Sequence, residues 1–176
     1  MSDFGQTSAL KYLEALRQSV AADRAYVFEF HAGAESDTVL TSQRYECTSE
    51  AAEPQIDNPE LQNVPFADMF PHWIETFERN QPYYGIVRTL PEVDREILGP
   101  QSILSLLVCP IVVDGDVWGF VGFDDCHRER EWTRAERSAL ANGSRALAAA
   151  LRHRAIKERL EVARAAVETM IASKDS

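Results

Sequence analysis

The chain has 176 residues, of which 45% are hydrophobic and 26% charged, as is usual for a soluble globular protein. Its net charge of −10, from 18 basic and 28 acidic residues, disfavours a nucleic-acid partner, because phosphate binding depends on clustered Lys and Arg. No apolar run approaches the ~20 residues of a membrane helix and the N-terminus does not resemble a signal peptide, so we expect a cytoplasmic protein without membrane contact. Three cysteines without a CxxC spacing are expected to be reduced thiols.

One helix followed by two strands is predicted in the first third of the chain. Leucines recur on one face over residues 8–22, a pattern typical of a helix. The aromatic segment from Arg24 to Phe30 favours a strand, and residues 39–47 can pair with it. The polar, proline-containing segment 48–65 is expected to be irregular.

Short elements separated by breakers are expected between residues 71 and 100. Residues 71–80 begin with proline, which suits the first helical position, and they place apolar side chains on one side. Residues 83–87 are compatible with a short strand. Residues 91–98 predict another short helix, which Gly99 and Pro100 end.

A buried hairpin is predicted at the centre of the fold. Residues 102–113 and 117–125 are apolar runs joined through Asp114-Gly115, a dipeptide that accepts positive φ in a tight turn. Both runs are apolar at odd and even positions, so we expect protein to cover both faces. Gly119 and Gly122 within the second run are expected to allow a helix to approach closely.

A long helix is predicted at the C-terminal end. Thr133 and Glu136 have the spacing of a capping box, and no proline follows before the end of the chain. The distal half carries a heptad seam, which indicates packing against a partner helix. The seam consists of Ile156, Leu160, Ala163, Val167 and Met170.

These segments together resemble the GAF domains found in bacterial histidine kinases and diguanylate cyclases. The resemblance covers about residues 8–151 and rests on RAYVFEF, Leu90-Pro91 with Asp94-Arg95, SLLVCPI, the DG turn, VWGFVGFDDC and the segment 130–132. It implies an α+β, GAF-like fold with a central antiparallel sheet of about six strands. The N- and C-terminal helices would cover one face of that sheet, and short helices and loops would enclose a ligand pocket on the other.

Catalytic signatures such as GxSxG, a Walker loop, HExxH or GxGxxG after a strand do not occur in the sequence. Cys109 is interpreted as a small core residue, and Cys126 and His127 should point to opposite sides of a strand end. The resemblance raises two further chemistries. Bilin-binding and methionine-sulfoxide-reducing GAF domains carry a Cys upstream of the SLLVCPI strand, and residues 83–101 contain none. Haem ligation through His31 or His72 stays open.

A small-molecule site is predicted from aromatic residues and a few polar groups, although each of these side chains could instead fill the core. We single out Trp73, Tyr83 and Asp124 as ligand contacts. The full candidate set also contains Tyr84, Ser105, Leu107, Trp118 and Phe120. Ser105, Leu107 and Cys109 should share one face of their strand, and Trp118, Phe120 and Asp124 one face of theirs. The sequence indicates no metal site, and the ligand and any cofactor are left unassigned.

We therefore expect a GAF domain over residues 1–151 and a helical signalling extension over residues 152–176. The expected function is a non-catalytic sensor that binds a small molecule in signal transduction, in a two-component system. Its partners would be a second copy in a parallel homodimer and a kinase or cyclase output domain. Two alternatives stay open, namely a thiol-based reductase that uses Cys126, and a dimerisation module without a ligand.

Overall fold

A six-stranded antiparallel sheet forms the centre of the computed structural model, which describes residues 3–35 and 37–174. The strand order across the sheet is β3-β2-β1-β6-β5-β4. The strands are β1 (Arg24–Ala32), β2 (Val39–Thr48), β3 (Val64–Pro65), β4 (Tyr83–Ile86), β5 (Ser105–Val113) and β6 (Asp116–Asp125). The helices are α1 (Asp3–Ser19), α2 (Phe66–Met69), α3 (Pro71–Glu78), α4 (Glu92–Leu98) and α5 (Arg134–Lys174). This arrangement confirms the predicted α+β fold.

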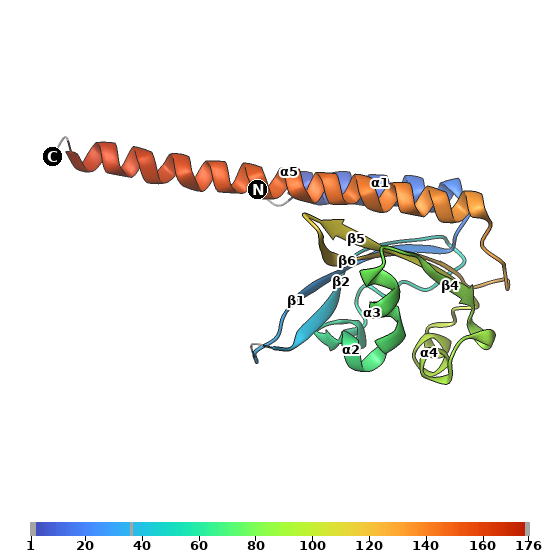
Figure 1. Ribbon diagram of the computed structural model, residues 1–176. Coiled ribbons are helices and arrows are strands. Elements are labelled where there is room, and N and C mark those ends of the chain that lie inside the picture. Colours follow the sequence, from blue (N-terminus) through green and yellow to red (C-terminus); the bar gives the residue numbers. More distant parts are fainter. Residues whose placement is uncertain (1–2, 36, 175–176) are drawn as a thin grey trace.

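The two faces of the sheet are covered by different sets of helices (Figure 1). α1 and the first half of α5 lie side by side on one face, which we call the helix face. Short helices α2, α3 and α4 cover the other face together with 3-10 turns at Pro59–Leu61, Val87–Thr89 and Gly99–Gln101, and we call this layer the cap. Each face has its own apolar core, so the sheet is buried on both sides.

The predicted central hairpin is confirmed. Strands β5 and β6 pair along their whole length through a turn in which Asp114 has a φ of 52° and Gly115 a φ of 89°. Phe120 is 3% exposed and Val121 fully buried, although their side chains leave opposite faces of β6. Both faces of the hairpin are therefore covered by protein, as its continuous apolar pattern predicted.

The strand glycines have a different role from the one we expected. A Cβ on Gly119 would lie 2.0 Å from the backbone oxygen of Phe28, so this glycine lets β1 approach β6. A Cβ on Gly122 would lie 2.4 Å from the ring of Tyr26, so this glycine makes room for an aromatic side chain in the neighbouring strand. The close helix approach occurs at Gly143 in α5, where a Cβ would lie 2.8 Å from Leu16 in α1.

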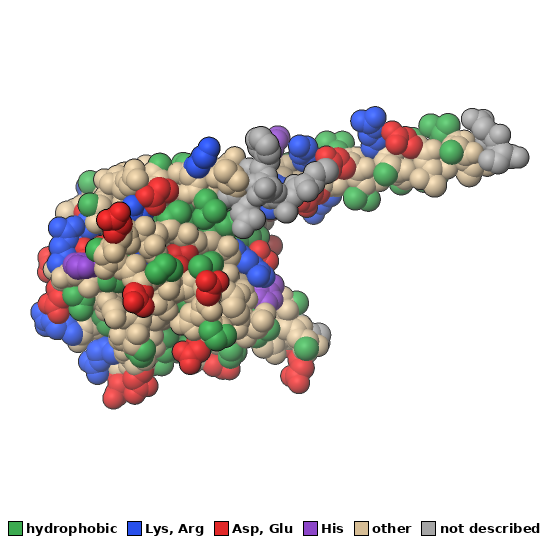
Figure 2. Space-filling view, turned by 180° about the vertical axis from the view of Figure 1, so that it is seen from behind, with side chains coloured by type: hydrophobic (Ala, Val, Ile, Leu, Met, Phe, Trp, Pro, Cys, Tyr) green, Lys and Arg blue, Asp and Glu red, His purple; other side chains and the backbone are tan. Residues whose placement is uncertain are grey.

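The long C-terminal helix is also confirmed, and its start has the predicted capping box. Thr133 Oγ1 accepts from Glu136 N at 3.2 Å, and Thr133 N donates to Glu136 Oε2 at 2.8 Å. Leu140 and Leu147 pack on the sheet, whereas every residue from 152 to 173 is exposed. Figure 2 shows hydrophobic side chains on this projecting part of α5. Among the described residues, no helix is both long and apolar enough to cross a membrane.

Candidate functional site

A small cavity of about 50 Å³ lies between the sheet and the cap. The inner strands β1, β2 and β6 contribute the residues of its floor, and α2, α3 and α4 contribute those of its roof. One part of its wall is aromatic and the other is polar. The aromatic part is formed by Phe28, Phe66, Phe70, Trp73 and Phe120, and the polar part by Arg24, Thr41, Gln43, Glu46, Gln55, Gln101 and Asp124.

The aromatic wall is a stack of rings centred on Phe120. The Phe28 and Phe120 rings are parallel, with centroids 4.8 Å apart, and Phe66 lies 5.5 Å from Phe120. Trp73 meets Phe120 edge to face at 6.0 Å and stacks on Phe70 at 4.1 Å. Such contacts between the strands and the cap stabilise the roof beyond simple burial of area.

The polar wall is built around a buried ion pair. Arg24 Nε lies 3.2 Å from Asp124 Oδ2, with both side chains almost fully buried. The Tyr26 hydroxyl donates to Asp124 Oδ1 at 2.9 Å. Burial raises the pKa of the Asp124 carboxyl to about 6, although the Arg24 charge and the Tyr26 hydrogen bond act in the opposite direction. Asp124 therefore holds β1 and β6 together through its contacts with Arg24 and Tyr26.

A second buried carboxylate holds the cap. Asp94 in α4 is completely buried, and its Oδ2 accepts from Tyr83 OH at 2.6 Å and from Trp73 Nε1 at 3.3 Å. His72 Nε2 lies 2.8 Å from the same oxygen. Burial and this carboxylate raise the pKa of the Tyr83 hydroxyl. Asp94 therefore links α3, β4 and α4. It also accepts the indole N–H of Trp73, so this N–H is not available to a ligand in the cavity.

The predicted site residues separate into two groups. Trp73, Phe120 and Asp124 line the cavity, as the prediction required. Tyr83 begins strand β4, its hydroxyl donates to Asp94 in the cap, and it is not part of the cavity wall. Ligand contact by any of these residues stays a prediction.

The other four residues lie elsewhere, so the expectation that all eight surround one pocket is wrong. Leu107 is on the helix face, and Ser105 Oγ accepts from Arg130 N at 2.8 Å near the end of the hairpin. Tyr84 is 42% exposed and lies under the guanidinium of Arg137. Trp118 belongs to the helix-face core.

A strand irregularity explains the error at Trp118. Ile111 pairs with Gly119 and Val112 pairs with Val117, so Trp118 is the extra residue in β6. One extra residue reverses the side-chain alternation along a strand. Trp118 therefore points to the face opposite Phe120, although the two residues are two positions apart in the sequence.

Asp124 is the one residue of the polar wall that was predicted from the sequence, and the six others, among them Arg24, Gln43 and Glu46, were not. A similar irregularity in β2, where Tyr45 pairs with Val27 and Gln43 with Phe28, hides the alternation of this strand. The available sequence signal was Gln43 itself, a polar residue in the middle of a predicted strand, and the structure buries its side chain to 4% exposure. Glu46 is held by Gln55 N and Ile56 N, which donate to its Oε2 at 2.7 and 2.8 Å.

The cysteines and histidines considered for chemistry, Cys109, Cys126, His31 and His72, are buried or bound to neighbouring side chains. Burial raises the pKa of the Cys126 thiol to about 11 and that of Cys109 to about 12, and Cys109 is a core residue as predicted. His31 Nε2 lies 2.8 Å from Ser42 Oγ, and His72 contacts Asp94. Neither histidine lines the cavity, so the structure offers no support for a haem bound there through either of them.

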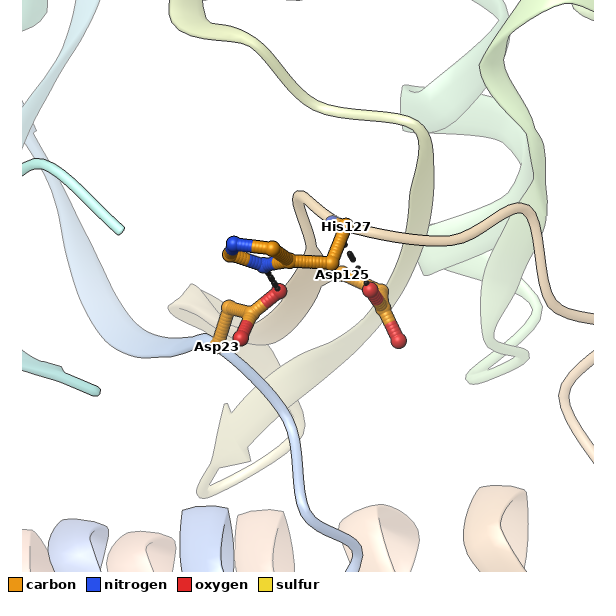
Figure 3. Close-up of side chains that lie close together, drawn as sticks. All are labelled: Asp23, Asp125 and His127. Atoms are coloured by element: carbon orange, nitrogen blue, oxygen red, sulfur yellow. Dashed lines mark hydrogen bonds and ion pairs between the residues drawn. The ribbon is translucent and has the colours of Figure 1, made fainter. Parts of the chain in front are cut away.

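Asp23, Asp125 and His127 form a compact polar cluster at the end of β6 (Figure 3). Asp23 Oδ2 lies 2.8 Å from His127 Nδ1 and accepts from Cys126 N at 2.7 Å. Asp125 Oδ2 is paired with Arg128 at 2.8 Å and with Arg130 at 3.4 Å. Two guanidinium groups thus pair with Asp125, and the cluster forms an ion-pair network at the end of the hairpin.

A family model for the GAF domain matches residues 6–151. The chain belongs to the GAF domain family. The resemblance read from the sequence is therefore confirmed, and its implied architecture agrees with the observed fold.

Curated relatives of this GAF domain are histidine kinases. It is 48% identical over 128 residues to the methanogenesis regulatory histidine kinase FilI of Methanothrix harundinacea, a match covering 73% of this chain and 14% of that protein. It is 27% identical over 158 residues to the circadian input-output histidine kinase CikA of Synechocystis, a match covering 78% of this chain and 20% of that protein. The chain thus spans a fifth or less of each relative's length.

Solved structures show the same fold. The blue-light absorbing form of the Thermosynechococcus elongatus PixJ GAF domain has a TM-score of 0.74 at 18% identity and covers 90% of this chain and 91% of that one. The photoproduct state of GAF3 from Slr1393 of Synechocystis has a TM-score of 0.72 at 17% identity, and the match covers 89% of this chain and 98% of that one. Identities this low support the fold and not a common ligand.

Proposed function

We propose that this GAF domain is a non-catalytic sensor module of a signal-transduction protein, which binds a small molecule in the cavity and transmits its occupancy through α5. The observation that carries the proposal is the cavity itself, closed by aromatic rings and flanked by polar side chains. Small-molecule sites combine apolar walls with a few placed polar groups in this way.

The sheet offers a direct route from the cavity to α5. Phe120 and Asp124 in β6 line the cavity, whereas Val121 and Phe123 on the opposite face of the same strand belong to the core beneath α1 and α5. Leu140 and Leu147 of α5 share that core. A ligand that shifts β6 would therefore change the packing under α5, because packed cores do not deform independently of their neighbours.

The projecting part of α5 suits a parallel homodimer that leads to an output domain. Apolar side chains along the predicted seam are 48% exposed at Ile156, 65% at Leu160, 53% at Val167 and 62% at Met170. A second copy would bury this stripe. A parallel arrangement would bring both C-terminal ends together, which suits the kinase output domains of the curated relatives.

The alternatives from other functional classes have weaker support. A thiol reductase needs a reactive thiolate, whereas burial raises the pKa of Cys126 to about 11. One solved neighbour, the far-red absorbing dark state of JSC1_58120g3, has bound biliverdin. The cavity of the present chain, at about 50 Å³, is far smaller than the several hundred Å³ of a site for a large organic ligand. Sulfoxide reduction by the purified chain that is lost in Cys126→Ser would favour the reductase.

The test screens a library of metabolites for compounds that raise the melting temperature of the protein, measured by thermal unfolding. Leu61→Phe adds a ring at the cavity wall, and Leu151→Phe is the matched control on the helix face. We expect at least one compound to raise the melting temperature of the wild type and of Leu151→Phe but not of Leu61→Phe. Compounds that stabilise all three proteins equally, or none of them, would contradict binding in the cavity.

A further inference from the structure

The polar wall of the cavity contains two oxygen atoms that lack hydrogen-bond partners. Gln43 Oε1 and Glu46 Oε1 are both buried and have no donor within the part of the chain that the structure describes. Both residues line the cavity, and Gln43 is only 4% exposed. A buried acceptor without a donor costs about 1–3 kcal/mol, so such atoms are normally paired with protein, water or ligand.

The chemistry of Glu46 specifies what a partner must provide. Its Oε2 is held by two backbone N–H groups, and this leaves Oε1 as the unused oxygen of a fixed carboxylate. A carboxylate oxygen only accepts hydrogen bonds. The group that meets it must therefore donate, and a positively charged donor makes the strongest bond.

The cavity does not offer a free cation for an anionic ligand. Arg24 is its only basic wall residue in the described chain, and its charge is already paired with that of Asp124. Its Nη1 donates to Glu53 O at 3.3 Å and its Nη2 donates to Gln101 O at 2.6 Å. Nε makes no hydrogen bond, but it lies 3.2 Å from Asp124 Oδ2 in the ion pair. An anion would have to displace one of these partners and would also lie near two carboxylates.

The opposite wall also favours a cation. Phe28, Phe120 and Trp73 belong to the aromatic part of the cavity wall, and Trp73 cannot use its N–H on a ligand because Asp94 accepts it. Cations are attracted to aromatic faces, most strongly when they are desolvated. A site with one arginine, two carboxylates and several rings is thus suited to positive charge.

The volume limits the ligand to a few non-hydrogen atoms. A site for one water needs roughly 10–15 Å³, so about 50 Å³ holds a molecule a few times that size. We propose that the cavity binds a small alkylammonium ion. Its nitrogen would donate to Gln43 Oε1 and Glu46 Oε1, and its hydrocarbon part would pack against Phe120 and Trp73. This rests on the proposed sensor function and adds the chemical class of the ligand.

The test compares three small probes of the same length. Ethylammonium chloride, ethanol and sodium acetate are each titrated into a solution of the chain at constant ionic strength, and binding is measured by calorimetry. We expect ethylammonium to bind at least 10-fold more tightly than ethanol, and acetate not to bind. Equal or tighter binding of acetate or ethanol would overturn the cationic class while leaving the sensor function intact.

Variants locate the site. Glu46→Gln should weaken ethylammonium binding at least 10-fold, whereas Glu50→Gln, an exposed acid four residues further on, should leave it unchanged. Gln43→Met, which keeps side-chain length and removes the acceptor, gives a second arm if Glu46→Gln fails to fold. Undiminished binding in the folded variants, or no ethylammonium binding to the wild type, would overturn the proposal. The metabolite library described above would then decide separately whether the cavity binds anything.

Discussion

Asp94 is the residue on which the position of the cap depends most. It is fully buried and receives hydrogen bonds from Trp73 and Tyr83, in addition to its contact with His72. Asp94→Ala would leave these donors buried without a partner, so we expect a loss of about 3–5 kcal/mol in the free energy of unfolding. Urea unfolding measures this loss, and Glu96→Ala, at an exposed position of the same helix, should change stability by less than about 0.5 kcal/mol.

Removing one donor provides a graded comparison. Tyr83→Phe deletes the 2.6 Å hydrogen bond to Asp94 and keeps the ring, so a loss of about 1–2 kcal/mol is expected. If both Asp94→Ala and Tyr83→Phe cost under about 0.5 kcal/mol, Asp94 does not fix the cap.

Asp124 makes stability depend on pH. Burial raises the pKa of its carboxyl from the ordinary value of 3.8 to about 6. The folded protein therefore holds this proton more tightly than the unfolded chain. The stability that it contributes is fully present below about pH 4 and is lost as the pH rises through about 6.

Comparison with Asp124→Asn isolates this effect. Between pH 4 and pH 7 the unfolding free energy of the wild type should fall by about 2–3 kcal/mol relative to the variant. Both proteins retain the remaining titrating groups, including His127, whose pKa is raised by its hydrogen bond to Asp23. Parallel pH profiles for the two proteins would show that Asp124 does not titrate in this range.

At the scale of the elements, the β5–β6 hairpin holds both cores. Phe120 is 3% exposed and contacts three other rings of the cavity wall and the ring of Phe77, so Phe120→Ala should cost about 3–5 kcal/mol. Asp116→Ala, at an exposed position of the same strand, serves as the control for denaturant unfolding. A cost under about 1 kcal/mol for Phe120→Ala would mean that the hairpin is not central to the fold.

The hairpin also shows how much a sequence can reveal about such a fold. Continuous apolar runs, the Asp114-Gly115 turn and the capping box at Thr133 depend on local chemistry, and each was predicted correctly. The face of Trp118 and the positions of Gln43 and Glu46 depend on extra residues in β6 and β2 that interrupt the alternation. Strand pairing sets these irregularities, and no single segment contains that information.

At the scale of the whole molecule, α5 extends well beyond the domain. Its 41 residues correspond to a length of about 60 Å, and its first half alone packs on the sheet. Leu160→Asp together with Val167→Asp should shift the chain toward monomer in light scattering and leave the thermal unfolding of the domain nearly unchanged. Arg164→Ala with Glu168→Ala, an exposed ion pair on the same segment, is the matched control. A wild-type chain that is monomeric at high micromolar concentration would contradict the dimer.

The occupancy of the cavity links all three scales, because Asp94 holds its roof, β6 of the hairpin contributes to its floor and α5 would carry its signal. The most direct measurement is a high-resolution crystal structure of the protein purified from cells without added ligand. We predict non-protein density between the Phe120 ring and the Gln43 and Glu46 oxygens, within hydrogen-bond distance of both. A cavity closed by its own side chains, with Gln43 and Glu46 hydrogen-bonded to protein groups, would contradict the account.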